Sequence, residues 1–156
     1  MTSTDLARYI AQHQIDATLI TNIGDTPTVF MAAAALGVGV DQVLKTLLFY
    51  IHGEPYVVIS HGVEPVPVRI LANHFGVGKR QVKLARPEQV LAETGFPVGG
   101  VPPIGHRNPH PVLMAQSILA YDIVFGGGGD DKTMLRIPVS ELLRLLTPDL
   151  LPLKPG

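Results

Sequence analysis

Two apolar segments separated by a short turn are the feature that most constrains how this chain can fold. Residues 45–51 read Lys-Thr-Leu-Leu-Phe-Tyr-Ile, and residues 56–60 read Tyr-Val-Val-Ile-Ser. Both segments are rich in the β-branched and aromatic residues that favour strands. Residues 52–55, His-Gly-Glu-Pro, are typical of a turn. The pattern predicts an antiparallel β-hairpin.

Capping residues and helix-ending glycines predict helices on both sides of this hairpin. Thr28 can cap a helix that ends at Gly37, and helices that begin at prolines are expected to end at Gly76 and Gly95. A short amphipathic helix is expected near the N-terminus. Further strands are predicted at residues 16–21, 83–85, 122–125 and 133–137, and a further helix at 138–146. This mixture predicts an α+β (mixed α/β) fold.

The length and composition are those of one globular domain. The chain has 156 residues, of which 46% are hydrophobic and only 16% are charged. So apolar a chain is not intrinsically disordered, and its length favours a single core. We therefore expect one domain over residues 1–156, with a Pro-rich tail at residues 148–156 that packs loosely.

The sequence contains no cysteine, which excludes disulfides, thiolate metal sites and cysteine nucleophiles. No apolar run approaches the roughly 20 residues that a membrane span needs, and no basic segment followed by a long apolar stretch opens the chain. We therefore expect a cytoplasmic protein without a membrane partner.

Charge is distributed unevenly along the chain. The net charge is −1, but residues 65–121 hold six basic and two acidic residues, so that segment carries +4 and the remainder −5. Four of the basic residues lie close together: Lys79, Arg80, Lys83 and Arg86. This cluster is either a phosphate-binding surface or an ordinary solvated face.

Several familiar catalytic patterns fail when their residues are examined. Residues 126–133 nearly match a P-loop, but Asp131 replaces the glycine before the lysine and a strand pattern follows where a helix is required. His106 and His110 have helical spacing in a segment whose prolines oppose a helix, so we predict no metal site and no cofactor. Adjacent Ser60 and His61 lack the surroundings of a nucleophile.

Two glycine-containing loops and one lysine remain as candidates. Residues 96–111 form a long Pro-rich loop of the kind that binds ligands. Four glycines at 126–129 permit close approach by a ligand or by another backbone, or form a flexible turn. Lys45 lies on the same strand face as Leu47 in the hairpin pattern, so it either reaches solvent or points its charge into a pocket.

The order of these motifs resembles the YbaK family of aminoacyl-tRNA deacylases, which includes the editing domain of bacterial prolyl-tRNA synthetases. The similar segments are Thr28, residues 32–38, 42–49, 94–95 and 99–105, and the glycine run before the last long strand. The resemblance extends over residues 24–146. Lys45 in its setting and the loop from Gly99 to Pro103 are its specific parts.

The resemblance implies a single mixed α/β domain around a curved, mostly antiparallel sheet. It also implies a free-standing enzyme that hydrolyses the ester between a wrong amino acid and the 3′-terminal adenosine of tRNA. Family members act in trans and remove alanine, cysteine or serine from mischarged tRNA. The tRNA expected for this chain is related to tRNA for proline. The implied partners are the acceptor end of an aminoacyl-tRNA and an aminoacyl-tRNA synthetase.

The resemblance also implies roles for particular residues. Lys45 would be catalytic and contact the substrate near the ester, while Thr28 would line the amino-acid pocket. The other implied substrate-binding residues are Gly99, Gly100, Val101, Pro102, Pro103, Gly127, Gly128 and Gly129. The cluster at residues 79–86 would contact tRNA phosphates.

One position departs from the family pattern, and it affects the expected substrate more than the activity. The family has a small polar residue where this chain has Pro102, which removes an N–H group and a hydroxyl from the loop. A non-catalytic module that binds aminoacyl-tRNA ends or a synthetase is the main alternative function. An unrelated small-molecule hydrolase is disfavoured, because the sequence offers neither a nucleophile nor a metal constellation.

Overall fold

The predicted hairpin lies at the centre of the fold. In a computed structural model of the chain, which describes residues 1–21 and 28–153, strands β2 (Leu44–Ile51) and β3 (Glu54–His61) pair antiparallel along their whole length. Ile51 opposes Glu54, so the turn contains only His52 and Gly53 and is two residues shorter than predicted. Both turn residues have positive φ, 51° and 83°, as tight hairpin turns require.

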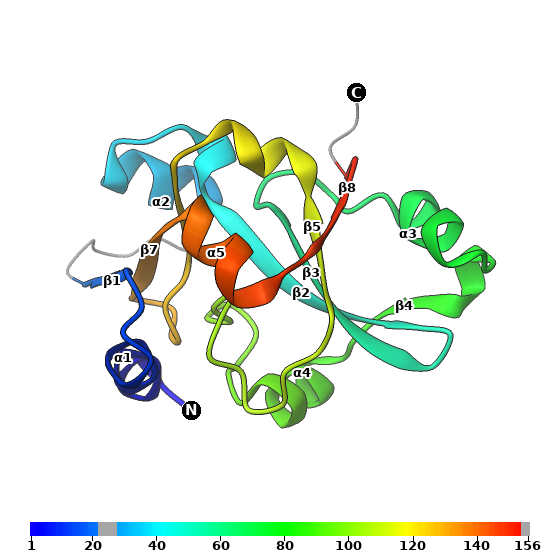
Figure 1. Cartoon of the computed structure of the whole chain (residues 1–156), viewed down its shortest axis with the longest axis horizontal. Helices are drawn as coiled ribbons and strands as arrows, with labels where there is room; N and C mark the ends of the chain where they lie inside the picture. The colour runs from blue at the N-terminus through cyan, green and yellow to red at the C-terminus, as the bar shows by residue number, and fades with distance from the viewer. Residues whose placement is uncertain (22–27, 154–156) are drawn as a thin grey trace.

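The hairpin belongs to a five-stranded sheet with the order β4-β2-β3-β5-β8. β4 (Val82–Leu84) pairs antiparallel with β2, whereas β5 (Val112–Ala115) runs parallel to β3. β8 (Asp149–Leu151) adds to the far edge, parallel to β5. Figure 1 shows β2 crossing the molecule, from its start near α2 to the hairpin turn with β3 near β4.

A second sheet of three antiparallel strands has the order β1-β7-β6. Its strands are β1 (Thr18–Ile20), β6 (Ile123–Gly127) and β7 (Met134–Pro138). One isolated bridge between Val43 and Phe125 joins the two sheets beside the start of β2. The predicted α+β fold with mostly antiparallel pairing is confirmed, but its strands form two sheets rather than one curved sheet.

The five described helices begin and end close to the predicted residues. They are α1 (Ser3–Gln12), α2 (Val29–Leu36), α3 (Val68–Phe75), α4 (Pro87–Thr94) and α5 (Val139–Leu146). Thr28 caps α2 as predicted, because its Oγ1 accepts a hydrogen bond of 3.1 Å from the Met31 N–H. Gly37, Gly76 and Gly95 end their helices with positive φ.

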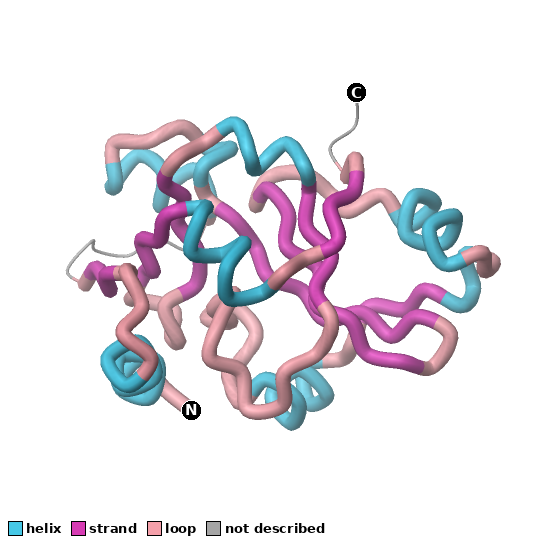
Figure 2. Tube along the Cα trace, in the orientation of Figure 1, coloured by secondary structure: helices cyan, strands magenta, loops and turns pink. Residues whose placement is uncertain are grey.

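Three short 3-10 helices connect these elements: η1 (Val40–Gln42), η2 (Lys79–Gln81) and η3 (Gln116–Ala120). The long loop between α4 and β5 contains neither helix nor strand, as predicted (Figure 2). None of the helices in residues 1–21 and 28–153 is long and apolar enough to cross a membrane.

The prediction of a loosely packed tail is wrong for the residues up to Leu153. Leu151 ends β8 with 7% of its surface exposed, and Leu153 is completely buried. The physical reason is that β5 would be the edge strand of its sheet without the tail. The tail supplies the hydrogen-bonding partner for this edge of β5. Residues 154–156 lie outside the described residues, as do residues 22–27 between β1 and α2.

Candidate functional site

A cavity of about 400 Å³ lies at an unpaired edge of β2. On the side of β2 away from β3, β4 pairs with Phe49 to Ile51, the Ala85 N–H donates a hydrogen bond of 2.9 Å to the Leu48 carbonyl, and the next described backbone pairing is the bridge at Val43. The edge between these points is left without a strand partner in the described part of the chain. The cavity is therefore a consequence of dividing the strands into two sheets.

The lining of this cavity is mostly apolar, with two threonines, Thr28 and Thr46, and one charged side chain. Among the described residues that line it, Lys45 is the only ionisable one. The wall is formed by residues of seven segments: α2, β2, β4, the start of α4, the long loop, β6 and β7. Five of the residues that the resemblance implied are brought together here: Thr28, Lys45, Gly99, Val101 and Gly127.

Lys45 is held in position by a backbone oxygen. Its Nζ donates a hydrogen bond to the carbonyl of Glu64, which follows the end of β3. The side chain is half-buried, and this burial lowers the pKa of the ammonium from its usual value of 10.5, while the nearby Glu64 carboxylate opposes the shift. An ammonium group beside apolar walls interacts more strongly with a developing negative charge than it would in water.

We expect the lowered pKa of Lys45 to be measurable directly. In the folded protein its side-chain ¹⁵N and ¹³C NMR signals should report a pKa below 10.5, and in the urea-denatured chain a pKa close to that usual value. Between the two values the unfolded chain binds more protons, so the contribution of Lys45 makes the free energy of unfolding rise with pH there. Identical titration in both states would contradict the burial of this group.

The loop at residues 99–103 and the glycine run pack directly against each other. Gly129 donates a backbone hydrogen bond of 2.8 Å to the Gly100 carbonyl. A methyl group at Gly127 would lie 2.8 Å from the Val101 carbonyl carbon, so the two backbones touch there. Of the alternatives open for the glycine run, close approach by another backbone is the one observed.

The remaining loop and glycine residues support the wall without lining it. Pro102 and Pro103 are buried, and Pro103 Cδ lies 3.4 Å from where a Gly126 methyl group would be. Gly128 faces the Thr133 backbone, and Gly129 faces Ser3 at the start of α1. Five of the residues implied by the resemblance do not line the cavity: Gly100, Pro102, Pro103, Gly128 and Gly129.

His106 has a structural role that sequence reasoning missed. Its Nε2–H donates a hydrogen bond of 2.5 Å to the Pro102 carbonyl, which fixes the loop beside the cavity. Burial lowers the pKa of this imidazole, and the nearby His110 adds to the effect. Nε2 of His110 lies 2.6 Å from Oε2 of Glu93. Residues 1–21 and 28–153 contain no group of three or more His, Asp or Glu placed to hold a metal ion.

The basic cluster lies at the surface, and only its end at Lys83 and Arg86 adjoins residues that line the cavity. η2, which holds Lys79 and Arg80, instead adjoins the β2–β3 turn through the hydrogen bond from the His52 N–H to the Gln81 carbonyl. Lys79, Arg80, Lys83 and Arg86 are all exposed, and the Arg86 guanidinium pairs with Glu88 at 3.0 Å. Leu84 follows Lys83 directly and lines the cavity. That end of the cluster and the cavity are therefore continuous along one segment of chain.

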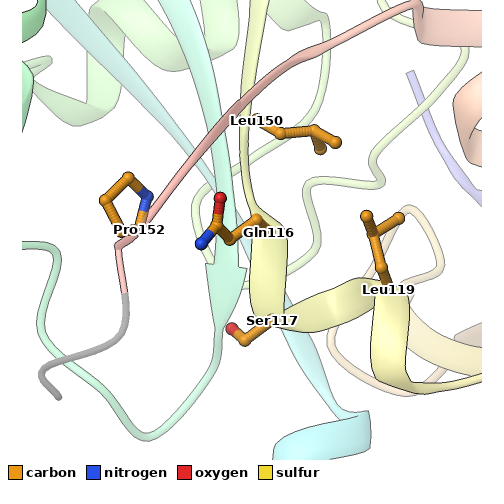
Figure 3. A pocket seen from close by; sticks show the side chains of 5 residues that line it. All are labelled: Gln116, Ser117, Leu119, Leu150 and Pro152. Atoms are coloured by element: carbon orange, nitrogen blue, oxygen red, sulfur yellow. The ribbon is translucent and has the colours of Figure 1, made fainter.

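A second cavity, of about 420 Å³, lies between η3 and the end of β8 (Figure 3). It is lined by Gln116, Ser117, Leu119, Leu150 and Pro152, none of which carries a charge. Ser117 Oγ lies 2.6 Å from Nε2 of the buried His61, whose Nδ1 lies 2.7 Å from the Asp41 carbonyl oxygen. None of the residues implied by the resemblance lines this cavity, so we assign the candidate site to the Lys45 cavity.

Ser60 and His61 do not form a pair with each other. Ser60 is fully buried, and its Oγ has no hydrogen-bond partner in the described part of the chain. His61 instead contacts Ser117 and the Asp41 carbonyl. The structure therefore agrees with the sequence-based rejection of a catalytic Ser60–His61 pair.

Comparison with known protein families gives a match over most of the chain. The model of the aminoacyl-tRNA editing domain matches residues 24–145. That range contains every residue that lines the Lys45 cavity.

Two curated relatives are similar over half of the chain or more. A proline--tRNA ligase of Nitratidesulfovibrio vulgaris (strain DP4) is 41% identical over 78 residues, 50% of this chain and 13% of the ligase. The chain therefore spans only a small part of the length of such ligases. The uncharacterised protein YwhH of Bacillus subtilis (strain 168) is 27% identical over 116 residues, 74% of this chain and 72% of YwhH.

The fold is also similar to a crystal structure described as a candidate trans-editing enzyme for prolyl tRNA synthetase. The two superpose with a TM-score of 0.88 at 28% sequence identity, over 99% of this chain and 97% of the other. The similarity therefore extends to both sheets and to the tail that forms β8.

Proposed function

Because this chain belongs to the aminoacyl-tRNA editing domain family, we propose that it is a deacylase that acts in trans on mischarged tRNA. The bond cleaved is the ester between the amino acid and the 3′-terminal adenosine. The observation that carries the proposal is Lys45, the one ionisable side chain among the described residues that line a mostly apolar cavity. An editing domain acts on aminoacyl-tRNA, so a cavity that accepts the aminoacyl end is what the family requires.

In the proposed reaction Lys45 stabilises charge and does not act as the nucleophile. Water adds to the ester carbon, the carbon–oxygen bond to the ribose breaks, and the ribose oxygen takes up a proton as the free amino acid leaves. The negative charge on the carbonyl oxygen in the transition state is stabilised by the Lys45 ammonium. The free hydroxyl group of the terminal ribose, next to the ester, helps to activate the water, as the family resemblance implies.

The loops around Lys45 position the substrate in this proposal. Gly99, Val101 and Gly127 bring backbone groups to the cavity wall, and Thr28 borders the space for the amino-acid side chain. An aminoacyl ester is already reactive, so correct placement of its carbonyl and of the water supplies much of the rate acceleration.

We also propose that the amino acid removed is small, namely alanine, cysteine or serine, and that the tRNA is related to tRNA for proline. The cavity of about 400 Å³ must hold both the amino acid and part of the terminal ribose. A difference of one methylene group changes binding by only about 1–3 kcal/mol, so neighbouring small amino acids would differ in rate by factors of roughly 10–200.

The decisive experiment is a deacylation assay with a panel of mischarged tRNAs. The purified protein is incubated with alanyl-, cysteinyl- and seryl-tRNA, and release of the amino acid is compared with spontaneous hydrolysis. Release above background for at least one substrate is the expected result. Tight binding of an uncleavable aminoacyl-adenosine analogue without turnover on any substrate would instead identify a non-catalytic binding module, and the proposal would be wrong.

The basic cluster should contribute to tRNA affinity through phosphate contacts. Replacing Lys79, Arg80 and Lys83 together by alanine should weaken binding and reduce the slope of log K against log salt by about 2, since each phosphate contact on a single strand contributes about 0.7. Fluorescence anisotropy with labelled tRNA at several salt concentrations measures this slope. The exposed Arg8 on α1 provides the control: Arg8→Ala should leave the slope unchanged. An unchanged slope in the triple variant would place the tRNA elsewhere.

A further inference from the structure

Two of the apolar side chains that line the Lys45 cavity are largely exposed. Leu84 on β4 is 58% exposed, and Val98 in the long loop is 62% exposed. Both also line the cavity, so their exposed surfaces continue its apolar wall outwards. Large apolar side chains that remain exposed at the rim of a cavity indicate a surface that a ligand covers.

Leu84 is held rigidly in its exposed position. It pairs with Phe49 across β4 and β2, and the next residue, Ala85, donates a backbone hydrogen bond of 2.9 Å to the Leu48 carbonyl. The exposure of Leu84 is therefore set by the sheet and not by a free loop. A rigid apolar surface binds a flat ring with little loss of conformational entropy.

The charges around Leu84 indicate which kind of ligand fits. Arg86 lies two residues after it and is exposed, whereas Lys83, its neighbour in β4, points to the opposite face of the strand. An apolar surface with Arg86 near it and the Lys45 ammonium in the adjoining cavity complements a nucleotide, whose base has an apolar face and whose phosphates are anionic.

We propose that Leu84 and Val98 form the binding surface for the base of the 3′-terminal nucleotide. The base would pack on these two side chains, with its ribose ester inside the cavity at Lys45 and its 5′ phosphate towards Arg86. This inference rests on the proposed function, because it names how that substrate is held. Since both side chains are aliphatic, they recognise the face of the base and not its hydrogen-bonding edge.

The proposal is tested by binding to a 5′-labelled RNA minihelix that ends in CCA. A matched minihelix has an abasic 3′-terminal nucleotide, so the two ligands differ only in the terminal base. The wild-type protein should bind the complete minihelix about 5- to 10-fold more tightly than the abasic one. The double variant Leu84→Ala/Val98→Ala should bind both with the weaker affinity, because the surface for the base has been removed.

Leu91 offers a matched control for this variant. It is an apolar side chain on α4 that is 47% exposed and does not line the cavity. Leu91→Ala should therefore retain the full preference for the complete minihelix. Because all three replaced side chains are mainly exposed, circular dichroism melting should confirm that each variant is folded.

The outcomes separate this inference from the proposed function. Equal binding of the two minihelices by the wild type, or a preference that survives in the double variant, would overturn the inference whether or not the protein deacylates tRNA. A preference that is lost in the double variant supports the inference even if no mischarged tRNA is hydrolysed, in which case only the proposed catalysis fails. With an active wild type, the double variant should raise the KM for aminoacyl minihelix about 5- to 10-fold while kcat changes little.

Discussion

Lys45→Ala should reduce the rate of aminoacyl ester hydrolysis by about 10²-fold or more. Removing one preorganised group that stabilises the transition-state oxyanion costs about 10²–10³ in kcat in well-studied hydrolases. Within residues 1–21 and 28–153, Lys45 is the sole ionisable group on the cavity wall, so no described neighbour there replaces its charge. The measurement is single-turnover release of amino acid from the mischarged tRNA that the wild type hydrolyses fastest.

Two further variants make this result specific. Lys45→Arg keeps the positive charge but replaces a compact ammonium by a larger planar group, so only partial activity is expected. Lys132→Ala removes an exposed lysine from the turn between β6 and β7 and should retain wild-type activity. If the Lys45→Ala protein has wild-type activity and a wild-type melting temperature, Lys45 has no catalytic role.

Gly127→Ala should lower the free energy of unfolding by about 1–3 kcal/mol or more and abolish most of the activity. The added methyl group would overlap the Val101 carbonyl oxygen and lie 2.8 Å from its carbon. Backbone atoms cannot rotate away as a side-chain end can, so β6 and the loop at residues 99–103 must separate. That separation opens the wall of the cavity that Gly99, Val101 and Gly127 form together. Urea denaturation and the deacylation assay measure the two effects.

Gly78→Ala is the matched control for Gly127→Ala. Gly78 has a φ of −78°, and no atom lies within 4 Å of where its methyl group would be. Alanine is compatible with that backbone and reduces the entropy of the unfolded chain, so the substitution should be neutral or stabilise by up to about 1 kcal/mol. Equal stability of the Gly127→Ala and wild-type proteins would show that the loop moves without cost.

The elements that depend on local signals were predicted closely. The hairpin strands, the Thr28 cap and the glycines that end α2, α3 and α4 are all where the sequence indicates. Each depends on residues within one turn or one strand, where capping and backbone preferences act directly. No element is predicted for Val112 to Leu119, because a short apolar run suits either a strand or a helix, and the structure has both β5 and part of η3 there.

The candidate site was only partly accessible from the sequence. Lys45 stands out because a cation within an apolar strand requires a partner or a pocket, and the structure supplies the Glu64 carbonyl and the cavity. His106 was considered only as a metal ligand, since nothing local indicates that its ring would hold the Pro102 carbonyl. Leu84 and Val98 carry no sequence signal, because apolar residues are common in any strand or loop.

The sequence by itself indicated most of the helices and strands, the single-domain class and the lysine on which the proposed chemistry depends, because these follow from short-range patterns of residues. The tertiary structure alone decided that the strands form two sheets with an open edge of β2 between them. It also decided that the glycine run packs on the loop at residues 99–103, and that the tail completes the larger sheet. Those arrangements depend on which strand edges and backbones find partners far away in the chain, and contacts between distant segments leave no periodic signal in the sequence.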